Sequence, residues 1–173
     1  MVVTGVMLTQ VGYTGGTSSD PTYYRLGDHT EVVRISFRPD ITSLTTLLNH
    51  FWSCHDSSQR RSSQYRSLIV CSREEDLHTA QTLLAQRRSL TTIVPEQRFY
   101  LAEEKHQKYY FKRHTPLVRC LAWDSPATSH LITRLNGYLG GRATVAAFNK
   151  EWEALGLSKR IAEYVRGVIV RRG

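Results

Sequence analysis

Three cysteines, Cys54, Cys71 and Cys120, are the residues of this chain best suited to nucleophilic chemistry. A neighbouring imidazole lowers the pKa of a thiol and raises its reactivity, so Cys54, which directly precedes His55, is the candidate nucleophile. The competing interpretation is a buried structural cysteine at the end of a helix. Cys71 falls in an expected core strand and Cys120 in the last third of the chain, and both are predicted to be packing residues.

Other catalytic patterns are absent from the sequence. The odd number of cysteines and the lack of Cys/His ligand spacing argue against a disulfide framework and a zinc site, and they favour a reducing compartment. Gly12, Gly15 and Gly16 fit neither phosphate-binding glycine pattern. We therefore expect no metal and no cofactor. The histidines outside any ligand spacing are expected to be structural or surface residues: His29, His55 and His106.

Apolar periodicity predicts the elements that must position these residues. Ser43 is expected to cap a helix over 43–54, and Ser125 and Pro126 to open one that ends near Asn136. The expected strands cover 2–11, 31–37, 67–71, 90–94 and 99–101, and the expected helices 43–54, 74–88, 103–112, 125–136, 145–155 and 158 onwards. This mixture predicts a two-layer α+β or α/β domain, with helices on one face of a small sheet and a helical C-terminal extension.

The composition is that of an ordinary globular domain, but the charge is high. The chain has 173 residues, and 23 Lys and Arg against 15 Asp and Glu give a net charge of +8. The longest apolar runs are far shorter than the roughly 20 residues that cross a bilayer, and no secretory or transit segment is visible. The charge indicates either a solvated basic surface or an anionic partner such as RNA, an acidic protein or a lipid surface.

Six ordered phrases carry more information than any single residue. They are Val11-Gly-Tyr-Thr-Gly-Gly16, Asp20-Pro-Thr-Tyr23, His29-Thr-Glu-Val-Val-Arg34, Phe51-Trp52 with His55-Asp56, Gln64-Tyr-Arg-Ser67, and Phe99-Tyr100 with Ala102-Glu103 and His106-Gln107. Together these phrases resemble the peptide methionine sulfoxide reductase A family over about residues 4–112. The resemblance implies a ferredoxin-like α+β core, a domain over 1–113, and a divergent, mostly helical basic extension over 114–173.

The resemblance also implies a chemistry and a set of site residues. The family reduces methionine sulfoxide with a thiolate that attacks sulfur, an acid that protonates the departing oxygen, and hydroxyls that hold this oxygen. By position, Glu31 corresponds to the proton donor, and Tyr23 and Tyr65 to oxygen-binding tyrosines. The alternative for Glu31 is a structural network in which both tyrosines satisfy a partly buried carboxylate.

Several departures from the family pattern bear on activity. Nothing in the sequence matches the family's GCFWG motif, so its nucleophile, its aromatic wall, and the first strand and helix of the core are expected to be missing. The stretch between His55 and Tyr65 is shorter than the family's and lacks its Asn-Asp pair. The loop before His29 is also short, Leu101 replaces a tyrosine, and the glycine-rich tail holds no cysteine.

These departures favour a non-catalytic pseudoenzyme that serves as a structural subunit of a larger assembly, such as an organellar ribosome or a membrane-associated complex. The alternative is an active peptide-methionine (S)-S-oxide reductase. In that case either Cys54 is a relocated nucleophile, or this chain belongs to a longer product. Thioredoxin is expected as a partner only in this second case. A third hypothesis is a sulfoxide-peptide reader that binds through Tyr23, Glu31 and Tyr65. The expected location is the mitochondrion or the cytoplasm.

Overall fold

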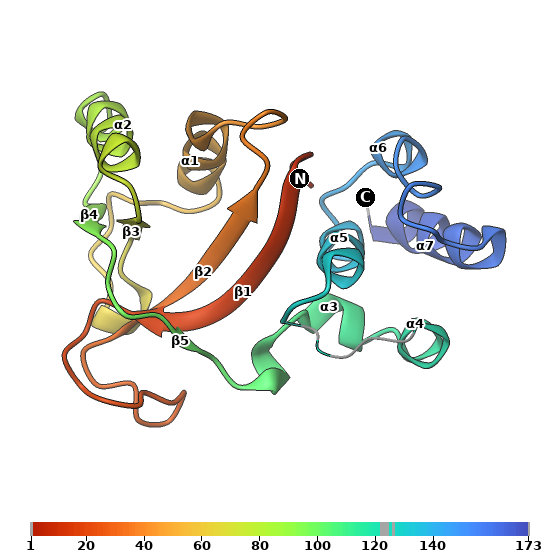
Figure 1. Ribbon diagram of the computed structural model, residues 1–173, viewed down its shortest axis with the longest axis horizontal. Coiled ribbons are helices and arrows are strands. Elements are labelled where there is room, and N and C mark those ends of the chain that lie inside the picture. The colour runs from red at the N-terminus through yellow and green to blue at the C-terminus, as the bar shows by residue number, and fades with distance from the viewer. Residues whose placement is uncertain (1, 122–124, 126, 173) are drawn as a thin grey trace.

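The computed structural model describes residues 2–121, 125 and 127–172. It has an α+β architecture, as the sequence predicts. In Figure 1 the strands lie on one side with two helices, and the C-terminal helices gather on the other. We call residues 6–103, which contain all the strands of the described chain, the sheet region, and residues 104–172 the helical region.

The longest strands form an antiparallel ladder that runs through the middle of the sheet region. β1 (Val6–Thr14) pairs with β2 (Thr30–Phe37) and, at its end, with the short β5 (Tyr100–Leu101), so the strand order is β2-β1-β5. The sequence predicts a strand that ends before Gly12, whereas β1 continues through it. A Cβ at Gly12 would collide with the Phe99 ring and the Tyr100 carbonyl oxygen, so glycine permits the close approach of β5.

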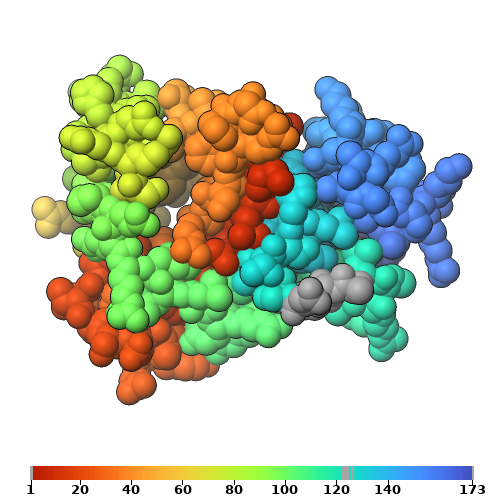
Figure 2. Space-filling model, viewed as in Figure 1, coloured from red at the N-terminus to blue at the C-terminus, as the bar shows by residue number. Residues whose placement is uncertain are grey.

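A second, two-stranded sheet stands apart from the first. β3 (Leu68–Cys71) and β4 (Thr92–Pro95) pair in parallel, joined by the crossover helix α2 (Glu74–Ala85). The single small sheet predicted from the sequence is therefore wrong. Among the described residues no strand pairs with the outer edge of β2, and Val33 on that strand is 55% exposed. Figure 2 shows an opening beside the orange atoms of the β2 segment.

Helix α1 (Leu44–Ser53) confirms the helix predicted over 43–54. The Ser43 hydroxyl accepts a hydrogen bond from the Thr46 N–H at 3.2 Å, which satisfies one of the free N–H groups of the first turn. The apolar face of α1 packs with α2 and β3 in a small cluster. This cluster contains four buried residues within the described part of the chain: Leu48, Ile69, Cys71 and Ala80.

The helix predicted over 103–112 divides into η2 (Glu104–His106) and α3 (Tyr109–Lys112). Between them the amide of the buried Gln107 donates to the Val11 C=O and accepts from the Val11 N–H at 2.8 and 3.0 Å. Lys108 follows with a left-handed φ of 49° and donates to the Thr9 carbonyl. These non-local bonds to β1 replace the helical bonds of this turn.

The helical region has the largest core of the molecule. Helices α4 (Thr115–Cys120), α5 (His130–Tyr138), α6 (Val145–Asn149) and α7 (Lys159–Arg172) pack around Phe111 and Phe148, which are fully buried. Ser129, not Ser125, caps α5, with its hydroxyl accepting from the Ile132 N–H at 3.2 Å. Pro126 of the predicted cap lies outside the described residues.

A buried arginine joins the helical region to the start of β1. Arg134 of α5 is only 4% exposed, and its guanidinium pairs with the Glu151 carboxylate at 2.9 Å and donates to the Val3 carbonyl at 2.6 Å. Within the described segments, no helix is both long enough and apolar enough to cross a membrane.

Candidate functional site

The candidate site forms at the Thr14 end of β1. In the β1–β2 register Tyr13 lies opposite Glu31, and directly paired residues of an antiparallel ladder share one face of the sheet. Tyr13 is buried against Leu26 and Ala102, whereas Glu31 is half-buried. The ladder thus places the Glu31 carboxyl group beside the Tyr13 phenol, whose orientation is fixed by burial.

Glu103 holds two of the tyrosine segments in place. The Tyr13 hydroxyl donates to Glu103 Oε2 at 2.7 Å, and the Tyr23 backbone N–H donates to Glu103 Oε1 at 3.0 Å. Burial and the Glu103 carboxylate raise the pKa of Tyr13. Burial on its own would raise the pKa of Glu103, but hydrogen bonds from its own N–H, from Tyr13 and from Tyr23 lower it. Glu103 is therefore an anionic anchor for this corner.

Tyr23 comes from the loop between β1 and β2 and is 38% exposed. Its ring stacks on His106, with centroids 4.8 Å apart and planes at 29°. The loop is closed by Asp28, which accepts hydrogen bonds from the Thr17 N–H and hydroxyl at 2.8 and 2.9 Å. These bonds lower the pKa of Asp28 to about 2. The stack and the closed loop together fix the direction of the Tyr23 ring.

Tyr65 approaches the same place from a third segment, the 3-10 helix η1 (Ser63–Tyr65). The Thr30 hydroxyl, which precedes Glu31, donates to the Ser63 carbonyl at 3.0 Å and holds η1 against β2. Tyr65 is 54% exposed. Partial burial, the neighbouring Tyr23 and Glu31, and a hydrogen-bonding contact with Tyr23 raise the pKa of Tyr65. The three residues predicted from the sequence are therefore brought together.

Glu31 is the residue of this cluster whose carboxyl group is left available. Glu31 makes no side-chain hydrogen bond or ion pair with any residue that the structure describes, and Tyr13 and Tyr23 bind Glu103 instead. A half-buried carboxyl group beside three phenols can donate a proton to an oxygen held by the hydroxyls of Tyr23 and Tyr65. We call these residues the tyrosine–glutamate cluster: Tyr13, Tyr23, Glu31, Tyr65 and Glu103.

Sequence reasoning missed Tyr13, Glu103 and His106 as parts of this site. All three stand in the phrases that carry the family resemblance, so the signal was present. Their roles depend on contacts across about 80 to 90 residues of chain, such as Tyr13 with Glu103. Spacing along the sequence does not reveal such pairs.

The structure places the candidate nucleophile Cys54 apart from the cluster. Cys54 is exposed at the C-terminal end of α1, with its sulfur 3.6 Å from His50 Nε2. Burial lowers the pKa of His50. No contact in the described part of the chain joins Cys54 to Tyr23, Glu31 or Tyr65.

The remaining cysteines and histidines have structural surroundings. Cys71 is buried in β3, and burial raises its pKa. Cys120 is exposed at the end of α4. His29 accepts from the Gly16 N–H and binds the Ser18 carbonyl, and His55 binds Ser67 Oγ at 2.9 Å. The residues that the structure describes contain no group of three or more acidic, histidine or cysteine side chains arranged to hold a metal.

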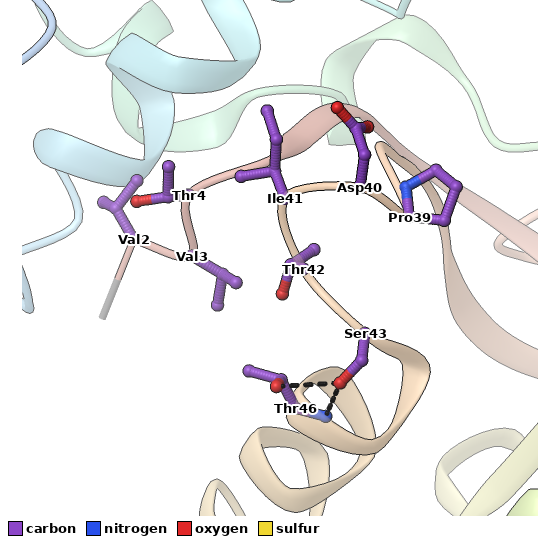
Figure 3. Close-up of a pocket in the computed structure, with 9 residues that line it drawn as sticks. All are labelled: Val2, Val3, Thr4, Pro39, Asp40, Ile41, Thr42, Ser43 and Thr46. Carbon is purple, nitrogen blue, oxygen red and sulfur yellow. Dashed lines mark hydrogen bonds between the residues drawn. The ribbon is translucent and has the colours of Figure 1, made fainter.

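One cavity of the described residues lies away from the cluster. It has a volume of about 550 Å³ and is bounded by the chain before β1 and by the β2–α1 connection. Figure 3 shows Val2, Val3 and Thr4 facing Ile41 and Thr42 across it. The opposite end of β1 carries Tyr13, roughly 23 Å away at about 3.3 Å per strand residue. The one carboxylate among the residues that line the cavity, Asp40, is paired with Arg38. This cavity therefore offers little for catalysis.

The sequence model of a family described as peptide methionine sulfoxide reductase matches residues 1–149 of this chain. The chain belongs to the peptide methionine sulfoxide reductase family. The match continues beyond residue 112, where the resemblance of the individual phrases ends, and it includes α5 and α6. The division at residue 113 stays a prediction.

Individual relatives agree with the family match. A peptide methionine sulfoxide reductase of Drosophila melanogaster is 37% identical over 171 residues, which cover 92% of this chain and 70% of that protein. A peptide methionine sulfoxide reductase A5 of Arabidopsis thaliana is 38% identical over 152 residues, covering 79% of this chain and 60% of that protein. The chain thus spans between 60% and 70% of the length of these two relatives.

A solved structure supports the fold. Methionine sulfoxide reductase A of Corynebacterium diphtheriae superposes with a TM-score of 0.55 and 29% identity, over 62% of this chain and 64% of that one. The α+β class is therefore shared with a member of the family whose structure is known.

The expectation of a non-catalytic structural subunit is wrong. Relatives that are 37% and 38% identical over most of the chain are named as reductases, and a reductase family model covers 149 residues. The absence of the GCFWG motif was given too much weight, because Tyr23, Glu31 and Tyr65 of the other family motifs are present and lie together. The expected compartment and the expected RNA, lipid and protein partners stay predictions.

Proposed function

We propose that this chain acts in the reduction of peptide methionine-S-sulfoxide to methionine. Tyr23 and Tyr65 bind the sulfoxide oxygen through their hydroxyls. Glu31 donates a proton to this oxygen as it leaves. The observation that carries the proposal is the free carboxyl group of Glu31, which is half-buried next to Tyr13 and Tyr65 and has no hydrogen-bond partner among the described residues. The family match supports the same reaction.

The reaction is balanced by two thiols. A thiolate attacks the sulfoxide sulfur, the S–O bond breaks, and the oxygen departs as water after protonation. The net change converts one sulfoxide and two thiols into one thioether, one disulfide and one water. Glu31 and the two phenols act on the oxygen side of this reaction, where hydrogen-bond donors stabilise developing negative charge.

The thiol has two candidate sources. One is a cysteine of a longer natural product that contains this chain. The other is Cys54, which is exposed and lies beside His50, and which can act on a sulfoxide bound at the cluster only if α1 moves toward it. The chain covers 60% to 70% of the two relatives described above, so the matched stretch need not hold every catalytic group. If the protein reduces the sulfoxide catalytically, thioredoxin is the reductant that we expect in the cell.

The test is a reductase assay with a methionine-S-sulfoxide peptide and dithiothreitol, on the 173-residue chain and on any longer natural product that contains it. We expect Glu31→Gln to lower turnover by about 10²- to 10⁴-fold, and Tyr23→Phe and Tyr65→Phe to lower it by about tenfold or more. Tyr24→Phe is the matched control, because Tyr24 is adjacent and 82% exposed. The proposal fails if neither protein reduces the sulfoxide peptide, or if the Glu31→Gln variant reduces it at the same rate as the unmodified protein.

Cysteine variants then locate the thiol. Turnover of the 173-residue chain that disappears in Cys54→Ser, and survives in Cys71→Ser and Cys120→Ser, assigns the nucleophile to Cys54. Turnover found only in a longer product assigns the nucleophile to a cysteine outside these residues. Both results support the reductase function and separate its two forms.

A further inference from the structure

A second, smaller cavity is lined by residues that directly follow Tyr65 of the tyrosine–glutamate cluster in the chain. It has a volume of about 260 Å³ and is formed by the connection after α1, by the residues that precede β3, and by one residue that precedes β4. Its lining contains three arginines and one exposed leucine. The lining residues are Gln59, Arg60, Arg61, Arg66, Ser67 and Leu90.

One wall of this cavity is fixed to the cluster. Arg66 Nε donates to the Thr30 hydroxyl at 2.6 Å, and another nitrogen of the same guanidinium donates to the Gly15 carbonyl at 2.9 Å. Arg66 directly follows Tyr65, and Thr30 directly precedes Glu31. The cavity is therefore lined by the residue that follows Tyr65 in the chain, and this residue is bonded to the one that precedes Glu31.

The two other arginines have no acidic partner. Neither the Arg60 nor the Arg61 guanidinium forms a hydrogen bond or an ion pair of 4 Å or less with any residue that the structure describes. The nearest carboxylate in the same loop is Asp56, and Arg61 contributes to lowering its pKa. Asp56 is already engaged, because it accepts hydrogen bonds from the Ser58 N–H and hydroxyl and from the Gln59 amide.

Two other exposed arginines of the sheet region are neutralised locally, whereas Arg25, Arg88 and Arg98 also have no ion pair among the described residues. Arg38 pairs with Asp40 at 2.5 Å, and Arg73 pairs with Asp76 at 2.8 Å. Two unpaired guanidinium groups at a cavity attract anions, and the guanidinium fork binds a carboxylate with two parallel hydrogen bonds.

We propose that the arginine cavity binds acidic side chains that flank the methionine sulfoxide in the substrate peptide, so that the protein prefers acidic sequences. This inference rests on the proposed function. Acidic side chains two and three positions from the sulfoxide test this inference, because an extended peptide places them about 7 to 10 Å along the chain. The loop that supplies Arg60 and Arg61 is the loop in which this sequence departs from the family phrases, so the preference belongs to this chain in particular.

The experiment measures the affinity of labelled peptides by fluorescence anisotropy, without reductant, so that no turnover is needed. Three peptides are compared: one with methionine-S-sulfoxide and glutamates two and three positions away, one with lysines at those positions, and one with glutamates and unoxidised methionine. We expect the glutamate sulfoxide peptide to bind about tenfold more tightly than the lysine one. The preference should fall at about 1 M salt, where the Debye length is about 3 Å.

Variants connect the preference to the cavity. The double variant Arg60→Ala/Arg61→Ala should reduce the glutamate preference to about twofold or less, because both attracting charges are removed. Arg119→Ala, on the exposed face of α4, is the matched control and should keep the full preference. Equal affinity for the glutamate and lysine peptides, or an unchanged preference in the double variant, overturns the inference.

The third peptide separates this inference from the proposed function. If the sulfoxide and thioether peptides bind equally while the glutamate preference persists and depends on Arg60 and Arg61, the cavity is an acidic-peptide site and the oxygen-binding role is wrong. If the sulfoxide is preferred and the flanking charge has no effect, the oxygen-binding role stands and the cavity inference is wrong.

Discussion

The helical region and the sheet region of this protein are packed very differently. Within the described residues, the core of the helical region contains twelve buried residues in one cluster, whereas the two clusters of the sheet region contain four and three. Val33 and Ile35 of β2 are exposed although they stand on the strand that carries Glu31. The candidate site is therefore held by hydrogen bonds and ring contacts more than by a large apolar core.

The largest expected effect is the loss of a core aromatic side chain in the helical region. Phe148 is fully buried and packs edge-to-face on Tyr138 with centroids 5.0 Å apart. We expect Phe148→Ala to lower the free energy of unfolding by about 4 kcal/mol, and Leu48→Ala of the sheet region by about 2 kcal/mol. Urea unfolding followed by circular dichroism measures both. Equal losses would mean that the two regions do not differ in packing.

The second prediction concerns the contact between the regions. Arg134→Met removes the partner of the Glu151 carboxylate and the donor to the Val3 carbonyl. Because a half-buried charge and a carbonyl are left unpaired, we expect a loss of about 3 kcal/mol. Arg160→Met, which removes an exposed guanidinium from the start of α7, is the control and should cost less than about 1 kcal/mol.

The third prediction is a pH dependence that comes from Lys108. Burial lowers the pKa of Lys108 from 10.5 to about 8. Between these values the unfolded chain holds a proton that the folded chain has released, so the stability should rise with pH. We expect a gain of about 2 kcal/mol between pH of about 7.5 and 9.5, and no such gain in Lys108→Met. A flat profile for the unmodified protein would show that Lys108 is charged throughout this range.

The smallest effects are expected in the sheet region. Ser43→Ala removes the hydroxyl that caps α1 and should cost about 1 kcal/mol. Val33→Thr on the exposed face of β2 should change the stability by less than about 0.5 kcal/mol. A larger loss in Val33→Thr would indicate that this face is covered in solution.

Local rules predicted the elements whose signals are local. The helix with its cap at Ser43 and the strands around Val33 and Ile69 follow from periodicity and capping, and they were confirmed. The helix expected over 103–112 failed because Gln107 and Lys108 bond to β1, far away in the sequence. The separation into two sheets also depends on non-local pairing, which alternation within one strand does not encode.

The candidate site shows the same limit. Tyr23, Glu31 and Tyr65 could be named because motif phrases assign them positions in a known family. Tyr13 and Glu103 hold them in place through a contact that only the folded chain forms. The wrong conclusion about activity came from reading a missing phrase as a missing function.

The free outer edge of β2 has a consequence for handling the protein. Within the described part of the chain no strand pairs with this edge, and together with the exposed Val33 and Ile35 it is a template onto which an extended segment of another molecule can add. Arg34 on the same strand is held by Gln10 and lies over the Phe99 ring, so its charge protects this edge less than a mobile lysine would. We therefore expect aggregation of the purified chain at high concentration to begin at β2.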